Sequence, residues 1–348
     1  MLNSRLYQKI SIIGGGLMGT SLAFALQEQQ IAQQILILLK SKEQITKITA
    51  LDLKATINYK DLIDSELIFL AVPLASYADI FNELAKLNLP KNIIISDLGS
   101  VKTDIINLAQ AKIAANIFVP AHPIAGSEKS GTGTLVKNLY QGKKIIITQL
   151  QDQNSETIAN IWLRIGAKIE YMPPSLHDEI YAYVSHLVQK IAFHLNYLLH
   201  HSRKDITSLR EIYQSPDFNK FTRLYFSNHK MWQDIFAFNK THLAAALCKI
   251  ATSLQELIVK LDELISRQEA EVSNLNIKNL DLLLASLLAG LVQNVVKENV
   301  NNYQKYIGSG FADFVKIAES QKVELTDLTK GELGYLRDRL ANLLNYLH

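Results

Sequence analysis

The chain has 348 residues, of which 36 are basic and 33 acidic, with a single cysteine and a hydrophobic share of 48%. It is longer than the roughly 100 to 200 residues of one ordinary domain, so we expect two domains with substantial cores rather than extensive disorder. The nearly balanced charge, without a long run of one sign, excludes a typical nucleic-acid-binding surface.

The ends and apolar runs of the chain indicate where the protein works. Met1 to Lys9 lacks the apolar stretch of a secretory signal, and Cys248 has no second cysteine with which to form an internal disulfide. The longest apolar run, Leu282 to Val292, falls short of the about 18 residues that suggest a membrane span. We therefore predict a cytoplasmic protein that binds neither membrane nor nucleic acid.

From Lys9 to about Met172, short β-type runs alternate with helical stretches, which predicts a mostly parallel sheet covered by helices. The runs are nearly continuous in Ile, Leu and Val, as in strands buried on both faces. The predicted strands are Ile10–Ile13, Ile35–Leu39, Leu67–Val72, Ile93–Asp97, Ile117–Pro120, Ile145–Thr148 and Lys168–Tyr171.

After Pro173 and Pro174 the β-type runs disappear and apolar residues recur at helical spacing. We therefore predict an α/β fold in which a Rossmann-type domain, residues 1–172, precedes an all-helical domain, residues 173–348. The predicted helices are Leu176–Leu199, Met231–Arg267, either continuous or broken, and Asn279–Tyr306. The tail from Gly308 to His348 receives no function.

A glycine-rich turn follows the first predicted strand and opens an apolar helix. It reads Gly14-Gly15-Gly16-Leu17-Met18-Gly19. Glycine permits the tight turn, the approach of a pyrophosphate to the backbone and close packing of helix on strand, while the helix N-terminus favours negative charge. A purely structural turn is the alternative, but the strand-turn-helix context predicts a dinucleotide site.

The end of the second predicted strand indicates which dinucleotide binds. An NAD site normally places Asp or Glu there, whereas this chain has Lys40, Ser41 and Lys42. Cationic and hydroxyl groups suit a ribose 2′-phosphate, so we predict NADP as the preferred cofactor, with NAD possible. A solvated strand end without such a role is the alternative interpretation.

Polar motifs follow two further strands, where ligands of open parallel sheets bind. Ser96-Asp97-Leu98-Gly99-Ser100-Val101-Lys102 follows one, and a segment from Pro120 to Gly131 containing His122 and Ser127 follows the other. Val72 and Pro73, which close an earlier strand, would border the same crevice. A lone histidine is more often structural than catalytic, so spacing alone does not assign His122 a role.

Taken together, these motifs resemble those of the prephenate/arogenate (cyclohexadienyl) dehydrogenase family. The resemblance rests on the glycine turn, Asp97 to Lys102, His122-Pro123-Ile124-Ala125-Gly126, Ser185-His186-Leu187 and related motifs, and spans about Ile10 to Tyr306. His177-Asp178, Thr222-Arg223 and Met231-Trp232-Gln233-Asp234-Ile235-Phe236 complete the pattern.

The resemblance implies an NADP- or NAD-dependent oxidative decarboxylation of prephenate or arogenate in tyrosine biosynthesis, carried out by a homodimer formed through the helical domain. It assigns the proton-accepting role to His122, with Ser100 at the same substrate hydroxyl. Arg223 would grip a carboxylate of the dicarboxylate substrate. His186, Ser127 and Trp232 would contribute to the substrate site, and no metal is needed.

Asp217-Phe218-Asn219-Lys220 replaces the Gly-Phe-Arg-Asp sequence common in the family, which puts the geometry of that loop in doubt, and we expect a monofunctional enzyme. His177-Asp178 also fits as a helix cap or as packing at the domain junction. A β-hydroxyacid dehydrogenase of similar architecture is the rival enzyme, and a non-catalytic nucleotide-sensing protein is the rival from another class.

Overall fold

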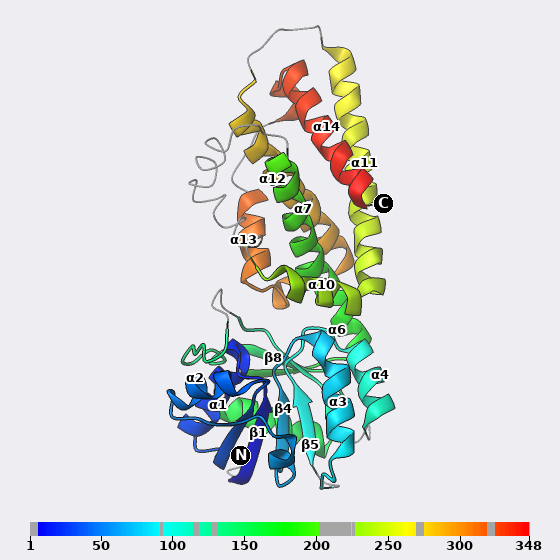
Figure 1. Ribbon diagram of the computed structural model, residues 1–348. Coiled ribbons are helices and arrows are strands. Elements are labelled where there is room, and N and C mark those ends of the chain that lie inside the picture. Colours follow the sequence, from blue (N-terminus) through cyan, green and yellow to red (C-terminus); the bar gives the residue numbers. More distant parts are fainter. Residues whose placement is uncertain are drawn as a thin grey trace. The chain divides into compact units, whose positions relative to one another are not determined.

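The computed structural model describes residues 6–90, 93–113, 118–126, 131–201, 224, 227–268, 275–318 and 324–347. The chain divides into two compact units (Figure 1). The first comprises Met1–Asp178 and Lys230–Asn239, and the second Glu179–His229 and Lys240–His348. The division falls a few residues after Pro173 and assigns a helical segment to the first unit, so the ranges 1–172 and 173–348 stay a prediction.

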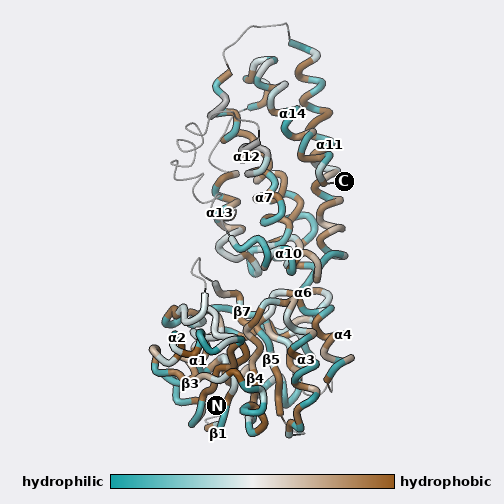
Figure 2. The backbone as a smooth tube through the Cα atoms, viewed as in Figure 1, coloured by the Kyte–Doolittle hydropathy of each residue, from teal (hydrophilic) through white to brown (hydrophobic). Residues whose placement is uncertain are grey.

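The first unit contains a six-stranded parallel sheet in the order β3-β2-β1-β4-β5-β6. The order reverses beside β1, and ligands of such sheets bind at the carboxyl ends of the strands beside this reversal, here β1 and β4. In Figure 2 the central strands β1, β4 and β5 are largely hydrophobic, as strands covered on both faces must be. The strands are β1 Tyr7–Ile13, β2 Ala32–Leu38, β3 Lys54–Thr56, β4 Leu67–Leu70, β5 Ile94–Asp97 and β6 Phe118–Val119.

Two apolar clusters cover the opposite faces of this sheet. One contains side chains of helices α1 and α5, including the fully buried Trp162, and the other contains side chains of α3, α4 and α10. The predicted fold class, a mostly parallel sheet domain followed by a helical domain, is confirmed. The helices are α1 Leu17–Glu28, α2 Ile45–Thr49, α3 Tyr77–Lys86, α4 Thr103–Lys112, α5 Gln153–Arg164 and α10 His229–Phe238, with short 3₁₀ turns η1 Lys42–Gln44, η2 Tyr59–Leu62 and η3 Leu74–Ser76.

The last strands of this unit form a second sheet in the order β7-β8-β9, rather than extending the first sheet. β7 pairs antiparallel with β8, and β8 pairs parallel with β9. Two strands were not predicted, β3 and β7. The strands of the second sheet are β7 Ala121–Pro123, β8 Lys144–Ile147 and β9 Lys168–Tyr171.

The second unit consists of helices and their connections, with no strand among its described residues (Figure 1). The predicted helix Leu176–Leu199 is continuous but contains one π-helical stretch, η5, and the predicted helix Met231–Arg267 breaks at Asn239 between α10 and α11. The elements are α6 Pro174–Tyr181, which crosses the division between the units, η5 Ala182–Leu187, α7 Val188–His201, α11 Lys240–Arg267, α12 Ile277–Asn299, η6 Tyr303–Lys305, α13 Ser309–Ala318, η7 Leu325–Asp327 and α14 Lys330–Leu347.

Helices α11 and α12 are long and apolar enough to cross a membrane by length and composition alone. In α12, 61% of the apolar window is buried inside the unit, where Leu284, Leu288 and Val292 are completely enclosed. Burial of this extent is expected for a core helix, so the composition is weak evidence for a membrane span.

Candidate active site

The glycine turn between β1 and α1 has the geometry that a dinucleotide requires. Gly14 has a φ of +110°, and a Cβ there would collide with the carbonyl group of Ala71. A Cβ at Gly19 would collide with the carbonyl oxygen of Gly14, whereas a Cβ at Gly16 would meet nothing within 4 Å. Gly14 therefore makes the turn, Gly19 lets the helix approach the strand, and Gly16 leaves the backbone at the start of α1 open to a pyrophosphate.

Several segments hold this turn in place. The amide of Gly133 donates to the carbonyl of Gly15 over 2.9 Å, and the hydroxyl of Tyr140 donates to the carbonyl of Met18 over 2.6 Å. A side-chain carbon of the half-buried Val72, after β4, would lie 2.9 Å from a Cβ at Gly14. Val72 therefore borders the turn, and these residues fit a bound dinucleotide; that Val72 and Pro73 bind the cofactor stays a prediction.

The segment after β2 presents its two predicted cations to solvent. Lys40 and Lys42 are exposed, while Ser41 is half-buried. The side-chain oxygen of Gln44 accepts the backbone amides of Lys40 and Ser41, and its nitrogen donates to the hydroxyl of Thr132 over 2.9 Å. Gln44 thus fixes the backbone that carries the two lysines.

A fully buried ion pair lies at the carboxyl end of β5. The ammonium of Lys102 is 2.6 Å from a carboxylate oxygen of Asp97, and both side chains have no exposed surface. That oxygen also accepts the amide of Gly99 and the hydroxyl of Tyr77, at 3.0 and 2.9 Å. Burial, opposed by the charge of Asp97, lowers the pKa of Lys102, and burial together with Asp97 raises the pKa of Tyr77 well above its usual value.

The same ion pair holds the residue that precedes His122. The amide of Ala121 donates to Asp97 over 3.0 Å, and the carbonyl of Ala121 accepts the ammonium of Lys102 over 2.8 Å. Because both backbone groups of Ala121 are bonded to the pair, strand β7 starts at a fixed position beside the end of β5. His122, the next residue, is half-buried on this strand.

His122 belongs to a line of three side chains. Its Nδ1 lies 2.8 Å from Nε2 of His177, whose Nδ1 lies 2.8 Å from a carboxylate oxygen of Asp178. His177 and Asp178 are buried. Burial lowers the pKa of His177 despite the opposing charge of Asp178; burial alone would raise the pKa of Asp178, but its bonds from His177 and the amide of Thr103 lower it.

Asp178 also caps helix α4 from a distant part of the sequence. Its carboxylate accepts the amides of Lys102 and Thr103 at 2.9 and 2.7 Å, two groups at the helix N-terminus that have no partner within the helix. The side-chain amide of Asn239 donates to the carbonyl of Asp178 over 2.8 Å. The chain of contacts from Asp97 through His122 to Asp178 therefore closes on itself at Lys102.

Comparison with known proteins identifies the protein family of this chain. Residues 22–171 match the family model described as prephenate dehydrogenase, nucleotide-binding domain, and residues 173–278 match prephenate dehydrogenase, dimerization domain. This chain belongs to the prephenate dehydrogenase family. The predicted family and enzyme class are thereby confirmed, and the chain is an oxidoreductase of tyrosine biosynthesis.

Individual relatives of the prephenate dehydrogenase family agree with this assignment. The cyclohexadienyl dehydrogenase of Zymomonas mobilis is 30% identical over 260 residues, covering 72% of this chain and 87% of the relative. The solved structure of Aquifex aeolicus prephenate dehydrogenase, in complex with hydroxyphenyl propionate and NAD+, is 31% identical with a TM-score of 0.66, covering 75% of this chain and 91% of that one. Synechocystis arogenate dehydrogenase, 22% identical with a TM-score of 0.58 over 86% of this chain and 100% of that one, shows the shared fold alone.

Only part of the predicted prephenate dehydrogenase site can be placed around His122. Ser100 is half-buried in the loop between β5 and α4, within the same unit. Ser127 and Arg223 lie outside the described residues. His186 is buried in the π-helical stretch of the second unit, and its position relative to His122 stays a prediction.

Trp232 lies on helix α10, which packs against the first unit. It is half-buried against the cluster that covers α3 and α4, and its ring centroid is 5.8 Å from that of Phe236. The motif predicted its position in the helical domain, whereas the contacts assign α10 from Lys230 onward to the sheet domain. A role for Trp232 at the substrate stays a prediction.

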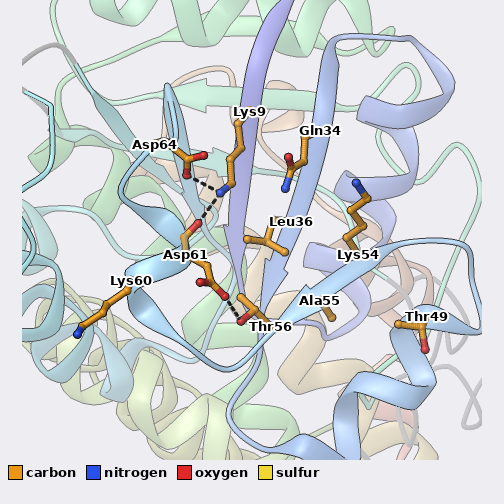
Figure 3. A pocket seen from close by; sticks show the side chains of 10 residues that line it. All are labelled: Lys9, Gln34, Leu36, Thr49, Lys54, Ala55, Thr56, Lys60, Asp61 and Asp64. Carbon is orange, nitrogen blue, oxygen red and sulfur yellow. Dashed lines mark hydrogen bonds and ion pairs between the residues drawn. The ribbon is translucent and has the colours of Figure 1, made fainter.

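A surface cleft away from the strand ends carries no sign of the chemistry (Figure 3). It lies over β1, β2 and β3 and contains charges of both signs, of which Lys9 and Asp64 form an ion pair. Lys9 contacts the carboxylate of Asp64 and the carbonyl of Asp61, each at 2.5 Å. Among the described residues no group of three or more His, Cys, Asp or Glu side chains could hold a metal ion.

Sequence reasoning singled out His122 but not the buried groups that support it. In the sequence, Asp97 and Lys102 are only parts of a polar motif, and His177-Asp178 fits a helix cap or packing at the domain junction. A signal was present, since charged residues are almost never fully buried unless paired, and a buried strand ending in Asp with Lys nearby suggests such a pair.

Proposed function

We propose that the protein oxidatively decarboxylates prephenate or arogenate, with NADP as the preferred cofactor. The observation that carries this proposal is the placement of His122: the backbone of Ala121 before it and the ring of His122 itself are both held by buried polar groups, in the unit that contains the open glycine turn. The Aquifex relative, which binds NAD+ and hydroxyphenyl propionate, supports a ring-containing substrate beside a nicotinamide.

In this reaction the protein positions the substrate and transfers one proton. A bound nicotinamide would supply the acceptor for the hydride that leaves the ring carbon bearing the hydroxyl. The imidazole of His122 accepts the hydroxyl proton as that carbon–oxygen bond becomes a carbonyl, and Ser100 orients the same hydroxyl by hydrogen bonding. Loss of the ring carboxylate as CO₂ sends its bonding electrons into the ring, which becomes aromatic, and the proton held by His122 returns to the phenolate oxygen.

The remaining predicted residues bind the substrate and the cofactor. Arg223 grips a carboxylate bidentately, while His186, Ser127 and Trp232 complete the substrate site. The backbone of Gly14, Gly16, Leu17, Met18 and Gly19 receives the pyrophosphate, with Val72 and Pro73 at its border. We place the enzyme in the cytoplasm.

The preference for NADP rests on the exposed cations after β2. Lys40 and Lys42 are exposed cations of the kind that bind a ribose 2′-phosphate, and Gln44 fixes the backbone at Lys40. Ratios of KM for NAD and NADP should favour NADP in the wild type and shift toward NAD in Lys40→Ala. A wild type that prefers NAD contradicts this part of the proposal.

A second copy of the chain is the proposed partner. The helical segment matches a dimerization domain, and an apolar groove lies between α11 and α14 in the second unit. The groove is lined by Ala244, Leu247, Cys248, Ala251, Thr252, Gln255, Glu256, Val259, Leu344 and Leu347. Sedimentation should therefore report a homodimer.

The activity is tested by following the absorbance of reduced nicotinamide with prephenate and arogenate, each with NAD and NADP. His122→Asn should lower kcat by about 100-fold or more with a smaller effect on KM, because it removes the proton acceptor. Arg223→Ala should chiefly raise KM. Unchanged turnover in His122→Asn would remove this histidine from the reaction.

A further inference from the structure

The line of side chains behind His122 does more than pack the unit. We propose that His177 and Asp178 are positioning residues that hold His122 in the tautomer protonated at Nδ1, so that Nε2 is the atom that accepts the substrate's proton. This proposal rests on the proposed function, because it assigns an atom and two supporting residues to the proton transfer described above.

The direction of the hydrogen bonds follows from the far end of the line. Both carboxylate oxygens of Asp178 accept backbone amides, from Lys102 and Thr103, so the group is held as an acceptor. An ionised carboxylate only accepts; burial alone would raise the pKa of Asp178, but it is lowered overall, and the amide of Thr103 is among the causes. The Nδ1 of His177, 2.8 Å away, must therefore be the donor.

The state of His177 then sets the state of His122. A neutral imidazole carries one proton, so a His177 that donates from Nδ1 has a bare Nε2. That atom lies 2.8 Å from Nδ1 of His122, which must donate to it. The neutral form is favoured because His177 is completely buried, and burial lowers its pKa.

Charges on every side of His177 bear on this assignment. Asp178 and Asp97 favour the protonated ring, while Lys102 disfavours it, and burial outweighs them. Lys102 is itself paired with Asp97 at 2.6 Å, so these two charges largely offset each other. The carboxylate of Asp178 is the charge that remains closest to the ring.

The arrangement also favours the charged form of His122 during the reaction. When Nε2 takes the substrate's proton, His122 becomes a cation whose Nδ1 proton points along the line toward Asp178. The carboxylate stabilises that cation, which makes His122 a stronger base. Asp178 cannot turn away easily, since its oxygens cap α4 and its carbonyl accepts Asn239.

Wild-type protein provides the first test, which needs no turnover. Long-range proton–nitrogen NMR correlations on histidine-labelled enzyme distinguish bare from protonated ring nitrogens, and His122→Asn identifies the signals of His122. We expect a protonated Nδ1 and a bare Nε2 at neutral pH. A protonated Nε2 with a bare Nδ1 would overturn the proposal.

Variants of His177 distinguish a hydrogen-bonding role toward His122 from a role in packing alone. His177→Gln keeps an amide oxygen that can accept from His122, whereas His177→Leu keeps only bulk. We expect kcat of the Leu variant to fall about 100-fold, and that of the Gln variant to stay within about 10-fold of wild type. Equal losses in the two variants would mean that His177 only fills space.

Asp178→Asn tests the charge through the pH profile of kcat/KM. The base must be unprotonated, so the rate falls as pH drops through its pKa. Removing the carboxylate lowers that pKa, and the acidic limb should move to lower pH while the plateau falls. A purely structural role would scale the rate equally at all pH values, and that result would contradict the proposal.

Asp281→Asn is the matched control. Asp281 on α12 is also a fully buried carboxylate, and it accepts the hydroxyl of Tyr335 over 2.6 Å. We expect it to lower the melting temperature while leaving the acidic limb in place. If the wild type oxidised neither prephenate nor arogenate, the proposed function would fail and the NMR result alone would decide the tautomer.

Discussion

Replacing Lys102 with methionine tests how strongly the buried ion pair holds the first unit together. Removing one partner of such a pair costs about 3 to 5 kcal/mol, because the other charge stays buried. Asp97 keeps three donors, from Tyr77, Gly99 and Ala121, which favours the lower end of that range. The carbonyl of Ala121 loses a charged donor, which adds about 1 kcal/mol. We expect a total loss of about 3 to 4 kcal/mol in the free energy of unfolding.

The assay follows tryptophan fluorescence in urea. The chain has two tryptophans, Trp162 and Trp232, and both belong to the first unit, so their emission reports its unfolding. Lys86→Met is the control, since its ion pair with Glu83 is largely exposed and should contribute less than about 1 kcal/mol. A loss below about 1 kcal/mol in Lys102→Met, at an unchanged m-value, would refute the reasoning.

Three other predictions concern separate parts of the molecule. Gly16→Ala should fold normally, because a Cβ there meets nothing within 4 Å of the protein, but calorimetry should show a loss of dinucleotide affinity, because that open space receives the pyrophosphate. Gly19→Ala should instead lower the melting temperature, because its Cβ would collide with the backbone. Asp152→Ala removes the side-chain cap of α5 and should cost about 1 kcal/mol in urea unfolding; no change would contradict the cap. Burial and the charge of Lys190 lower the pKa of His194 to about 4. The stability that this neutral histidine contributes above about pH 6.5 should therefore fall by at most about 3 kcal/mol as the pH drops toward 4. His194→Gln should flatten this pH dependence in urea unfolding followed by ellipticity.

Local sequence signals predicted most of the sheet domain for a simple physical reason. A central parallel strand is buried on both faces, so its run of Ile, Leu and Val is visible without knowing its partners. β3 was missed because an edge strand such as Lys54–Thr56 needs no apolar run, and its residues are exposed or half-buried. β7 was missed because Ala121–Pro123 contains a proline and exists through its pairing with β8.

At the boundary between the units, the periodicity of apolar residues predicts a helix but not the unit into which that helix packs. The spacing of apolar residues predicts the helix that begins near Met231 and leaves open a break before Arg267, and the structure places that break at Asn239. The spacing gives no information on whether that helix packs into the core of the sheet domain or into the core of the helical domain. Ile235 and its neighbours pack against the cluster over α3 and α4, a choice made by surfaces that lie far apart in the sequence.

The contacts of His122 with His177, and of His177 with Asp178, could not be predicted from the sequence for the same reason. Its partner His177 lies 55 positions away, and Asp178 lies 75 and 76 positions from the two amides it caps. No helical or strand period connects such residues, so a motif can name them without pairing them. What could have been foreseen is a constraint: buried charges need partners, so charged residues that end buried strands or begin buried helices must meet one another. In this enzyme that requirement is met by a closed network, and a change at any of its members should therefore reach the ring of His122.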